Sequence, residues 1–464
     1  MAKLPSTLFD KIWDLHSVGQ RQDGRHLLYI DRHIIHELHV PHAFSKFSSS
    51  ARPLRRRDLT AIVQDHTVPT RPGLELTSEH IKQARGYATQ YGIRLIEVDS
   101  LEHGIVHIVS AEQGFAMPGY TLACPDSHAS TVGALGCLSF GCGTSELEHI
   151  LATQTIVIDK PKQMLVKLNG ALQKGVGAKD VALHLIRTLG VNAGRGYAVE
   201  FSGSCVASMT LEERMTLCNM SIEWGCRTSI VAPDQKVFEW YESRNLLPSQ
   251  SLELQEMKDY WVGLHSDLDA NFDLVHVIDC DCIVPQISWG TDPSQVVSVT
   301  ESIPSLKQFD SQVRIQASKA LDYMGLSEGQ AMVGLSIDRV FIGSCSNSRI
   351  GDLRAAAQLI QGRKVASHVK AIVVPGSTSI KRQAELEGLD QLFIAAGFEW
   401  HNPGCSMCAG ANGEIGLPGE RCVSTSNRNY ENRQGRAVKT HLSSPLMAAA
   451  AALKGHICDV RDLY

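Results

Sequence analysis

The sequence contains no long apolar run, and this absence excludes two classes of protein. No segment approaches the roughly 20 consecutive apolar residues that a membrane-spanning helix needs. The opening residues, MAKLPST, lack the apolar core of a secretory signal peptide. We therefore expect a cytoplasmic protein without a membrane partner.

An excess of positive charge is also missing. Lys and Arg number 44 against 49 Asp and Glu, which gives a formal net charge of −5 at pH 7. Proteins that bind nucleic acid usually carry a basic excess, so no nucleic-acid partner is expected. The one basic stretch, residues 52–57, is predicted to be a solvated surface segment. With 464 residues, the chain is too long for one core, and two or three domains are expected.

The cysteines do not form the dense pattern of a secreted disulfide scaffold. Their number, 13, is odd, and they are spread along the whole chain, which favours reduced thiols and metal ligands. Cys345 follows an apolar run, and Cys405 and Cys408 form a Cys-x-x-Cys motif. A closed metal site has four ligands, so three thiolates would leave one corner open for Lewis-acid chemistry. The other ten are expected to be small buried residues: Cys124, Cys137, Cys142, Cys205, Cys218, Cys226, Cys280, Cys282, Cys422 and Cys458.

Short apolar runs alternate with helical patterns, which predicts an α/β fold with mostly parallel sheets. The proposed boundaries lie near residue 160 and in the proline-spaced stretch 285–304. They give three domains, 1–160, 161–300 and 301–464, and the last contains the three cysteines. The predicted strands include 27–30, 105–109, 156–158, 164–168, 338–342 and 371–374. The predicted helices include 144–155, 179–189, 210–224 and 445–453.

Two polar clusters suggest acid–base chemistry. Asp65 and His66 end an apolar run, and a carboxylate beside an imidazole stabilises its cation, as a general acid requires. Asp126, Ser127 and His128 precede several glycines, which let the backbone approach a ligand closely. Taken alone, the first cluster is better explained as a polar surface pair and the second as a polar turn. The same holds for His107, which lies in a β-like run and alone would be read as a core histidine.

Two further groups lie later in the chain. Asn219 and Glu223 are four residues apart, so on a helix they share one face. Glu is rarely buried without a partner, so this face is either solvated or lines a polar cavity. Asn427, Arg428 and Arg433 lie in a polar loop, and arginine binds carboxylates through two parallel hydrogen bonds.

In this order the motifs resemble the aconitase family, and most closely the large subunits of its two-subunit isopropylmalate isomerases. The resemblance runs nearly from end to end, and as an ordered set the motifs are highly specific. It implies three α/β domains around a cleft that contains an iron–sulfur cluster. The matching segments are LYIDRH, GTSELEHILATQT, MTLCNM, VFIGSC, PGCSMC, STSNRN and SPLMAAAAA.

The resemblance also implies chemistry. It places a [4Fe–4S] cluster on Cys345, Cys405 and Cys408, and a non-redox dehydration and rehydration of a small 2-hydroxy acid, as in leucine biosynthesis. Asp65 and His66 match the acid pair that serves the leaving hydroxyl. The remaining matches are to groups around the iron-bound water and hydroxyl (His107, Asp126, His128 and Glu223) and to substrate or cluster contacts (Ser127, Asn219, Asn427, Arg428 and Arg433).

In single-chain relatives a further, swivelling domain supplies the base. The resemblance implies that a separate small subunit carries it here, so we expect a heterodimeric or heterotetrameric enzyme.

The sequence departs from the large-subunit pattern at Arg195, Trp224, Gly351 and Asn432. None of these positions is a cluster ligand. They leave room for a related hydro-lyase acting on 2-methylmalate or citraconate, dimethylmaleate or a homocitrate-like acid. The sequence is also compatible with an RNA-binding regulator, with a catalytically inactive scaffold, and with a structural zinc held by the three cysteines and either His401 or His441.

Overall fold

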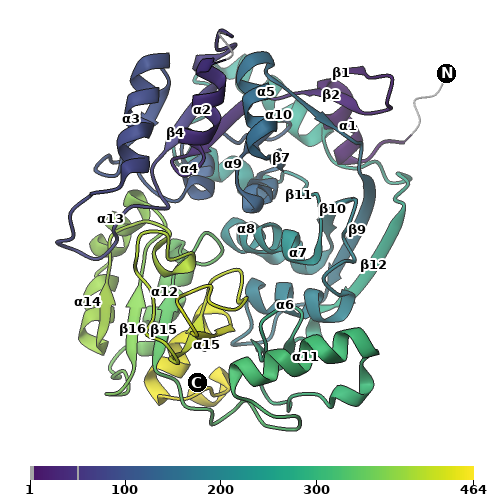
Figure 1. The fold of residues 1–464 in the computed structure, drawn as a ribbon. Coiled ribbons are helices and arrows are strands. Elements are labelled where there is room, and N and C mark those ends of the chain that lie inside the picture. Colours follow the sequence, from purple (N-terminus) through teal and green to yellow (C-terminus); the bar gives the residue numbers. More distant parts are fainter. Residues whose placement is uncertain (1–4, 50–51) are drawn as a thin grey trace.

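A computed structural model describes residues 5–49 and 52–464 (Figure 1). Three mainly parallel sheets flanked by helices form the molecule, which confirms the predicted α/β class. In Figure 1 the first sheet and its helices lie at the top, the second on the right and the third at the lower left. None of the helices in the described part of the chain has the length and apolarity that crossing a lipid bilayer would require.

The first sheet has the strand order β5-β4-β3-β6-β7, and all its pairs are parallel. Strands β4 and β6 are buried along their whole length and the middle strand β3 is buried except at Arg32, as expected for strands covered by helices on both faces. The strands are β3 (Arg32–His36), β4 (Thr60–Val63), β5 (Arg94–Ile96), β6 (Thr121–Cys124) and β7 (Leu138–Gly141). The helices are α2 (Val40–Ser49), α3 (Glu79–Tyr91), α4 (Val106–Glu112), the 3₁₀ segment η2 (Ser127–Leu135) and α5 (Thr144–Thr153).

A small antiparallel sheet, β1-β2-β8, lies beside the N-terminal helix. Its elements are α1 (Leu8–His16), β1 (Ser17–Gln20), β2 (His26–Tyr29) and β8 (Thr155–Ile158). The second parallel sheet has the order β11-β10-β9-β12, with strands β9 (Lys162–Asn169), β10 (Tyr197–Ser202), β11 (Thr228–Val231) and β12 (Leu274–Asp279). Its helices are α6 (Ala178–Leu189), α7 (Ser204–Ser208), α8 (Leu211–Asn219), η3 (Met220–Trp224), α9 (Gln235–Glu242) and α10 (Ser251–Gly263).

The third parallel sheet has the order β17-β16-β15-β18-β19, and a short antiparallel pair, β13 (Gln286–Ser288) and β14 (Val296–Ser298), precedes it. Its strands are β15 (Arg339–Ile342), β16 (Lys370–Val373), β17 (Phe398–Trp400), β18 (Arg421–Ser424) and β19 (Lys439–Leu442). Its helices are α11 (Ser311–Met324), α12 (Ile350–Ile360), α13 (Thr378–Leu386), α14 (Leu389–Ala396) and α15 (Pro445–Lys454).

One predicted strand is wrong. Residues 106–109 form the start of helix α4, with Ile105 as its N-cap, and all seven residues of this helix are buried. A short apolar run surrounded by core has no polar face, so its periodicity does not distinguish a strand from a helix. The predicted helix over 210–224 is divided into α8 and the 3₁₀ segment η3, although its Thr210–Glu213 capping box forms as expected. Of the ten remaining cysteines, Cys282 is exposed and therefore contradicts the prediction of burial.

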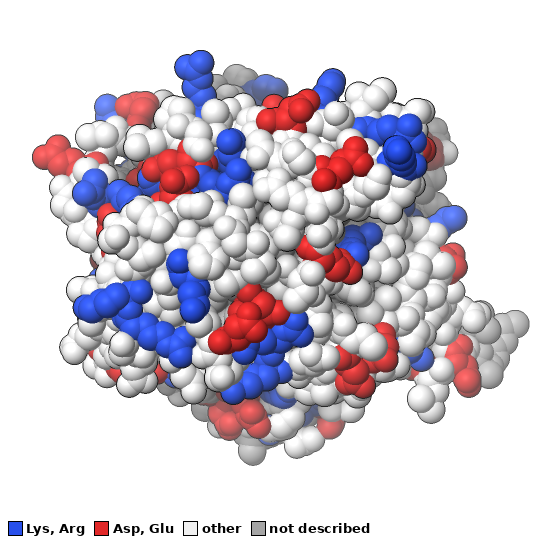
Figure 2. All heavy atoms as spheres, turned by 90° about the horizontal axis from the view of Figure 1, so that it is seen from below, with Lys and Arg blue, Asp and Glu red and all other residues white. Residues whose placement is uncertain are grey.

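The hydrophobic core is continuous between the first and second sheets, whereas the third sheet has its own large cluster. The domain boundaries therefore remain a prediction. Basic and acidic groups lie side by side on the face in Figure 2, with wide uncharged areas between them. Residues 52–57 are mostly exposed, as expected.

Candidate functional site

The predicted site residues follow the carboxyl ends of strands from two parallel sheets. Asp65 comes two residues after β4, and Asp126 comes two residues after β6. In the third sheet, Cys345 and Asn427 each lie three residues beyond the end of a strand, β15 and β18 respectively. This edge is where α/β sheets bind ligands.

His66 lies between two carboxylates. Its Nδ1 is 2.5 Å from Asp65 Oδ1, its Nε2 is 3.6 Å from Asp126 Oδ2, and its ring stacks on His36 at 4.2 Å between centroids. Burial alone would lower the pKa of His66, but Asp65, the Cys405 sulfur and Asp126 raise it well above its usual value. For Asp65 the two influences are reversed. Burial would raise its pKa, but the charge and hydrogen bond of His66 lower it by more, so the net shift is downward. The pair therefore holds an imidazolium beside a carboxylate.

Asp126 connects this pair to a second charged group. Asp126 Oδ1 lies 2.9 Å from His107 Nε2 and accepts the backbone N–H of His128 at 2.7 Å. His128 Nε2 is 2.7 Å from Glu223 Oε1, and Arg428 Nε donates to both Glu223 oxygens at 2.9 and 3.0 Å. Three imidazoles and one guanidinium thus surround two carboxylates.

The pKa shifts in this second group have the same physical origin. Burial would raise the pKa of Asp126, but His107 and the hydrogen bonds from His128 and His66 hold it well below its usual range. Burial would lower the pKa of His128, but hydrogen bonds to Asp126 and Glu223 raise it to about 10. The pKa of Glu223 is lowered because His128 and Arg428 outweigh its burial. The network therefore holds charge on both kinds of group.

The three cysteines lie next to this network. All are buried, with 7–8% exposure. Asn219 Nδ2 donates to Cys345 Sγ at 3.2 Å, and Cys408 Sγ lies 3.2 Å from Ser344 Oγ and 3.4 Å from Asn427 Oδ1. Cys405 Sγ is 3.8 Å from Asp65 Oδ2, which brings the Cys-x-x-Cys motif to the acid pair.

Both cysteine loops contain a strained residue. Ser344, before Cys345, has φ +78°, and Ser406, after Cys405, has φ +47°. A non-glycine residue in this region costs about 1–3 kcal/mol and is typical of ligand-binding loops. The strain indicates that these loops place the thiols at the expense of a favourable backbone conformation.

The donor set fits a cluster better than a single ion. A tetrahedral zinc with Zn–S bonds of about 2.3 Å would bring its sulfurs to about 3.8 Å from one another. Among the described residues, the one group of three or more His, Cys, Asp or Glu ligand atoms within 4.8 Å of one another is His36, Glu37, Asp65 and His66. The three sulfurs do not form such a group, but thiolates on separate irons of one cluster need not approach so closely.

The histidines proposed as a fourth zinc ligand are engaged elsewhere. His401 Nδ1 lies 3.2 Å from Thr70 Oγ1 and its Nε2 lies 3.2 Å from Glu399. His441 lies between the Ser288 carbonyl at 2.6 Å and the Arg421 guanidinium at 2.8 Å. The structure therefore does not support a structural zinc at the three cysteines.

The predicted substrate contacts lie around the same site, and they differ in which of their hydrogen-bonding groups already have partners. Arg428 is already paired with Glu223. Arg433 donates to Tyr430 Oη at 2.9 Å and lies 4.0 Å from Cys408 Sγ. Asn427 donates to Asn219 Oδ1, and Ser127 Oγ lies 3.5 Å from His128 Nδ1. The structure brings these residues together, while their roles stay predictions.

Sequence reasoning missed Glu37. Its carboxylate accepts the backbone N–H groups of Asp65, His66 and Thr67 at 3.0, 2.8 and 2.5 Å, and so fixes the loop that carries the acid pair. Burial raises the pKa of Glu37 to about 7. The signal was present in the sequence, because a carboxylate directly after a buried strand needs a partner.

Lys179 was also missed. It is 1% exposed, and its ammonium donates to Ser346 Oγ at 3.1 Å and to the carbonyls of Thr425 and Ser426 at 3.0 and 2.8 Å. It thereby joins helix α6 to the two loops of the third sheet that carry Cys345 and Asn427. Nothing in its local sequence distinguishes it from a surface lysine at the start of a helix.

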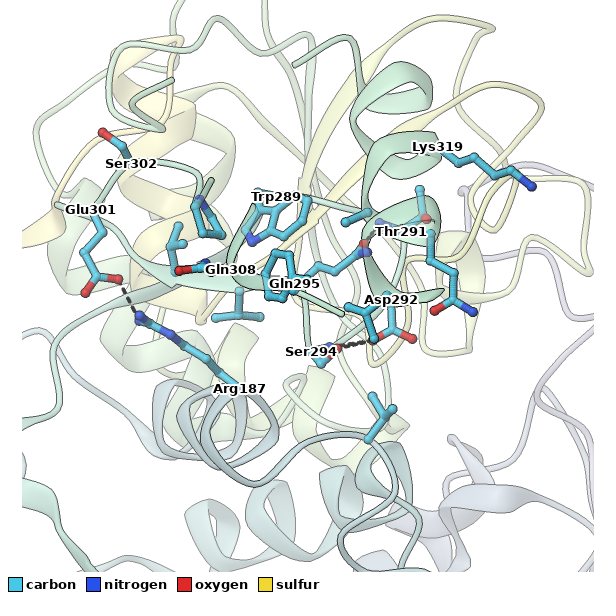
Figure 3. Close-up of a pocket in the computed structure, with 18 of the residues that line it drawn as sticks. Arg187, Trp289, Thr291, Asp292, Ser294, Gln295, Glu301, Ser302, Gln308 and Lys319 are labelled. Carbon is cyan, nitrogen blue, oxygen red and sulfur yellow. Dashed lines mark hydrogen bonds and ion pairs between the residues drawn. The ribbon is translucent and has the colours of Figure 1, made fainter. Parts of the chain in front are cut away.

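A hollow of about 840 Å³ lies away from this site and is lined mainly by residues between α6 and α11 (Figure 3). It contains none of the predicted site residues. Within it, Arg187 pairs with Glu301 at 2.7 Å and Ser294 donates to Asp292 at 2.6 Å, and Lys319 and Glu431 also line it. Size alone therefore does not identify the reactive site.

Comparison with known proteins gives the family. The model of the aconitase family (aconitate hydratase) matches residues 10–455. Among solved structures, the holo-form of aconitase X from Thermococcus kodakaraensis shares 10% sequence identity and gives a TM-score of 0.45, in a match that covers 87% of this chain and 84% of that one. A structural similarity this low adds nothing to the functional assignment. The family match spans nearly the whole chain and both halves of the site, and the chain belongs to the aconitase family of hydro-lyases.

Proposed function

We propose that this chain is the large subunit of a 3-isopropylmalate dehydratase, which interconverts 2- and 3-isopropylmalate by removing and restoring water. The observation that carries the proposal is the His66 imidazolium, held between Asp65 and Asp126 beside three buried thiols. A small subunit, which the resemblance to two-subunit relatives implies, would complete the site. The choice of isopropylmalate rests on that resemblance.

Cys345, Cys405 and Cys408 would hold the [4Fe–4S] cluster, and its open corner would act as a Lewis acid toward the substrate oxygen. The acid step is assigned to His66, whose proton on Nε2 faces Asp126 and is available to a leaving hydroxide. Asp65 holds the opposite ring nitrogen and fixes the orientation of the imidazole. His66 would thus neutralise the leaving group at the moment that it departs.

The remaining polar groups would position the substrate relative to the acid. Arg428 is fixed through Nε by Glu223, which leaves its terminal nitrogens available for a substrate carboxylate. Glu223 also binds His128, so the carboxylate-binding arm and the imidazole network are mechanically joined. Preorganised charges of this kind act most strongly where water is excluded.

The runner-up is a related hydro-lyase for methylmalate, dimethylmaleate or a homocitrate-like acid. Two of the departures that suggested it have structural compensation. Asn432 has φ +65°, a left-handed conformation that Asn adopts more readily than most other residues apart from glycine. The backbone N–H of Gly351 donates to Glu212 at 2.8 Å, and a side chain at this position would press on that carboxylate. Neither residue lies against the acid pair, so neither favours the runner-up.

The experiment is a parallel activity assay. The chain is reconstituted anaerobically with iron and sulfide, mixed with candidate small subunits, and offered isopropylmalate, methylmalate and citrate. Formation of the unsaturated intermediate is followed by ultraviolet absorbance. We expect isopropylmalate to have the highest kcat/KM by at least tenfold. A preference for methylmalate or citrate would move the assignment to the runner-up.

A further inference from the structure

A second, smaller hollow opens directly beside the acid network. It measures about 270 Å³ and is lined by Asp126 and Ser127 on one side and by Cys142, Ile222 and Arg227 on another. It lies where strands β6 and β7 end, on the same edge of the first sheet as Asp65. The hollow is large enough for part of a small organic acid, and it continues the candidate site.

Arg227 is a cation without a counter-ion at this position. Its Nη1 donates to the Gly141 carbonyl at 3.0 Å, and its guanidinium lies 5.5 Å from the Phe140 ring centroid. In the described part of the chain it forms no ion pair, although it is partly buried. Burial lowers the pKa of Arg227, and the more distant Glu146 and Cys142 offset this only in part. A carboxylate in the hollow would supply the missing charge.

Gly141 brings this guanidinium close to Ser127. A Cβ on Gly141 would lie 2.8 Å from the Asp126 carbonyl oxygen and 3.5 Å from Ser127 Cα. The end of β7 is therefore pressed against the Asp126–Ser127 turn, which only a residue without a side chain allows. Arg227, which is bonded to the Gly141 carbonyl, therefore lines the same hollow as Ser127.

The guanidinium groups of the other two arginines of the site have more partners within the protein. Arg428 gives its Nε to Glu223, and Arg433 is directed to Tyr430 and Cys408. A dicarboxylic acid has two carboxylates to satisfy, and Arg227 is the guanidinium of the three whose hydrogen bond goes to a neutral carbonyl. An arginine with free N–H groups can bind a carboxylate through two parallel hydrogen bonds.

We propose that Arg227, together with the Ser127 hydroxyl, binds one carboxylate of the hydroxy-dicarboxylic acid, with Ile222 and Cys142 as the apolar wall beside it. This inference rests on the proposed function, because it takes the substrate to be a diacid. It adds a binding residue outside the polar loop of Asn427, Arg428 and Arg433. It also predicts that discrimination between small diacids depends on the first and second sheets as well as on the third.

The test measures binding and turnover of 3-isopropylmalate by the cluster-loaded chain with its small subunit. Arg227→Gln should weaken binding in calorimetry at least tenfold and raise KM more than it lowers kcat, since a carboxylate bound equally before and during reaction contributes to KM. Arg227→Lys, which keeps the charge, should recover part of the affinity. Arg195→Gln removes an equal charge from an exposed position nearby and should stay within twofold of the parent.

The outcomes separate this inference from the proposed function. If the parent protein binds 3-isopropylmalate and Arg227→Gln binds it equally well, the subsite is wrong and the proposed function stands. If Arg227→Gln changes only the association of the small subunit, the hollow belongs to that interface and the subsite is again wrong. If the parent binds and converts no diacid, both fall. Circular dichroism of Arg227→Gln and Arg227→Lys distinguishes lost binding from lost folding.

Discussion

Buried carboxylates that face the cations of the site and buried carboxylates without such a partner behave in opposite ways. Asp65 and Glu223 have side-chain exposures of 0% and 6%, and the pKa of each is lowered. Glu112 and Glu200 are also buried, with 9% and 7% of the whole residue exposed, yet burial raises the pKa of each to about 7. Because all four side chains are buried, the group that each carboxylate contacts must decide whether its pKa rises or falls.

The partners are indeed different. Glu112 accepts a hydrogen bond from Ser377 and Glu200 one from Ser266, both neutral hydroxyls. Asp65 and Glu223 instead face imidazoles and a guanidinium. A buried ion pair is weak evidence for stability, because desolvation cancels much of its attraction. A network of several such pairs in one cleft therefore indicates function.

The largest effect is expected from removing the central cation. His66→Gln should lower kcat by about 10²- to 10⁴-fold, the range for a lost general acid. It should also destabilise the fold by about 3–5 kcal/mol, because Asp65 and Asp126 lose a shared partner. Steady-state kinetics and denaturant unfolding measure the two effects.

The control for this change is His103→Gln. His103 is fully buried, whereas the His66 side chain is 13% exposed, and His103 Nε2 bonds only the Gln64 carbonyl, outside the charged network. Its replacement should leave kcat within a few fold. Equal losses of kcat in both variants would show that His66 acts through packing and not through charge.

The second effect concerns the link between the imidazole network and Arg428. Glu223→Gln should lower kcat by about 10- to 100-fold and lower the pKa of His128, which Asp126 and Glu223 hold at about 10. Histidine resonances followed by NMR against pH give the shift. A His128 pKa that stays near 10 in this variant would contradict the assigned partner.

The third prediction is a gain in stability, whereas the first two variants lose activity. The folded chain keeps the proton of Glu112 between its ordinary pKa of 4.5 and its raised pKa of about 7, whereas the unfolded chain releases it. Parent stability should therefore fall as pH rises from 4.5 to 7 and stay level above. Glu112→Gln removes this loss, so it should stabilise the protein at pH 8, by up to about 3 kcal/mol.

Denaturant unfolding at pH 5 and pH 8 measures this gain. The variant should differ little from the parent at pH 5, where the carboxyl of the parent is neutral. A variant that is less stable than the parent at both pH values would show that Glu112 holds its charge through a partner, as Asp65 does.

The smallest effect is expected from an exposed pair. Arg354 Nε donates to Glu387 at 2.7 Å on the surface of α12. Arg354→Gln should cost less than about 1 kcal/mol and leave kcat unchanged, since solvent screens such pairs. A cost comparable to that of His66→Gln would remove the contrast between buried and exposed charges.

Much of the fold could be predicted from the sequence because buried strands leave an apolar run followed by a turn. The runs before Asp65 and Cys345 are predicted in this way. The prediction for 105–109 failed because the whole of α4 is buried and has no polar face. The site was predicted from ordered motifs, whereas Lys179 and Arg227 depend on contacts between distant segments. No local pattern marks such contacts.

The iron and acid-labile sulfide content of the anaerobically reconstituted chain decides whether its three site cysteines hold a cluster. We expect brown protein with about four irons and four sulfides per chain. Cys345→Ser, Cys405→Ser and Cys408→Ser should each lose them, while Cys422→Ser, a buried cysteine of β18, should keep them. A folded parent chain that stays colourless and free of iron would contradict the assignment of these thiols and the chemistry built on them.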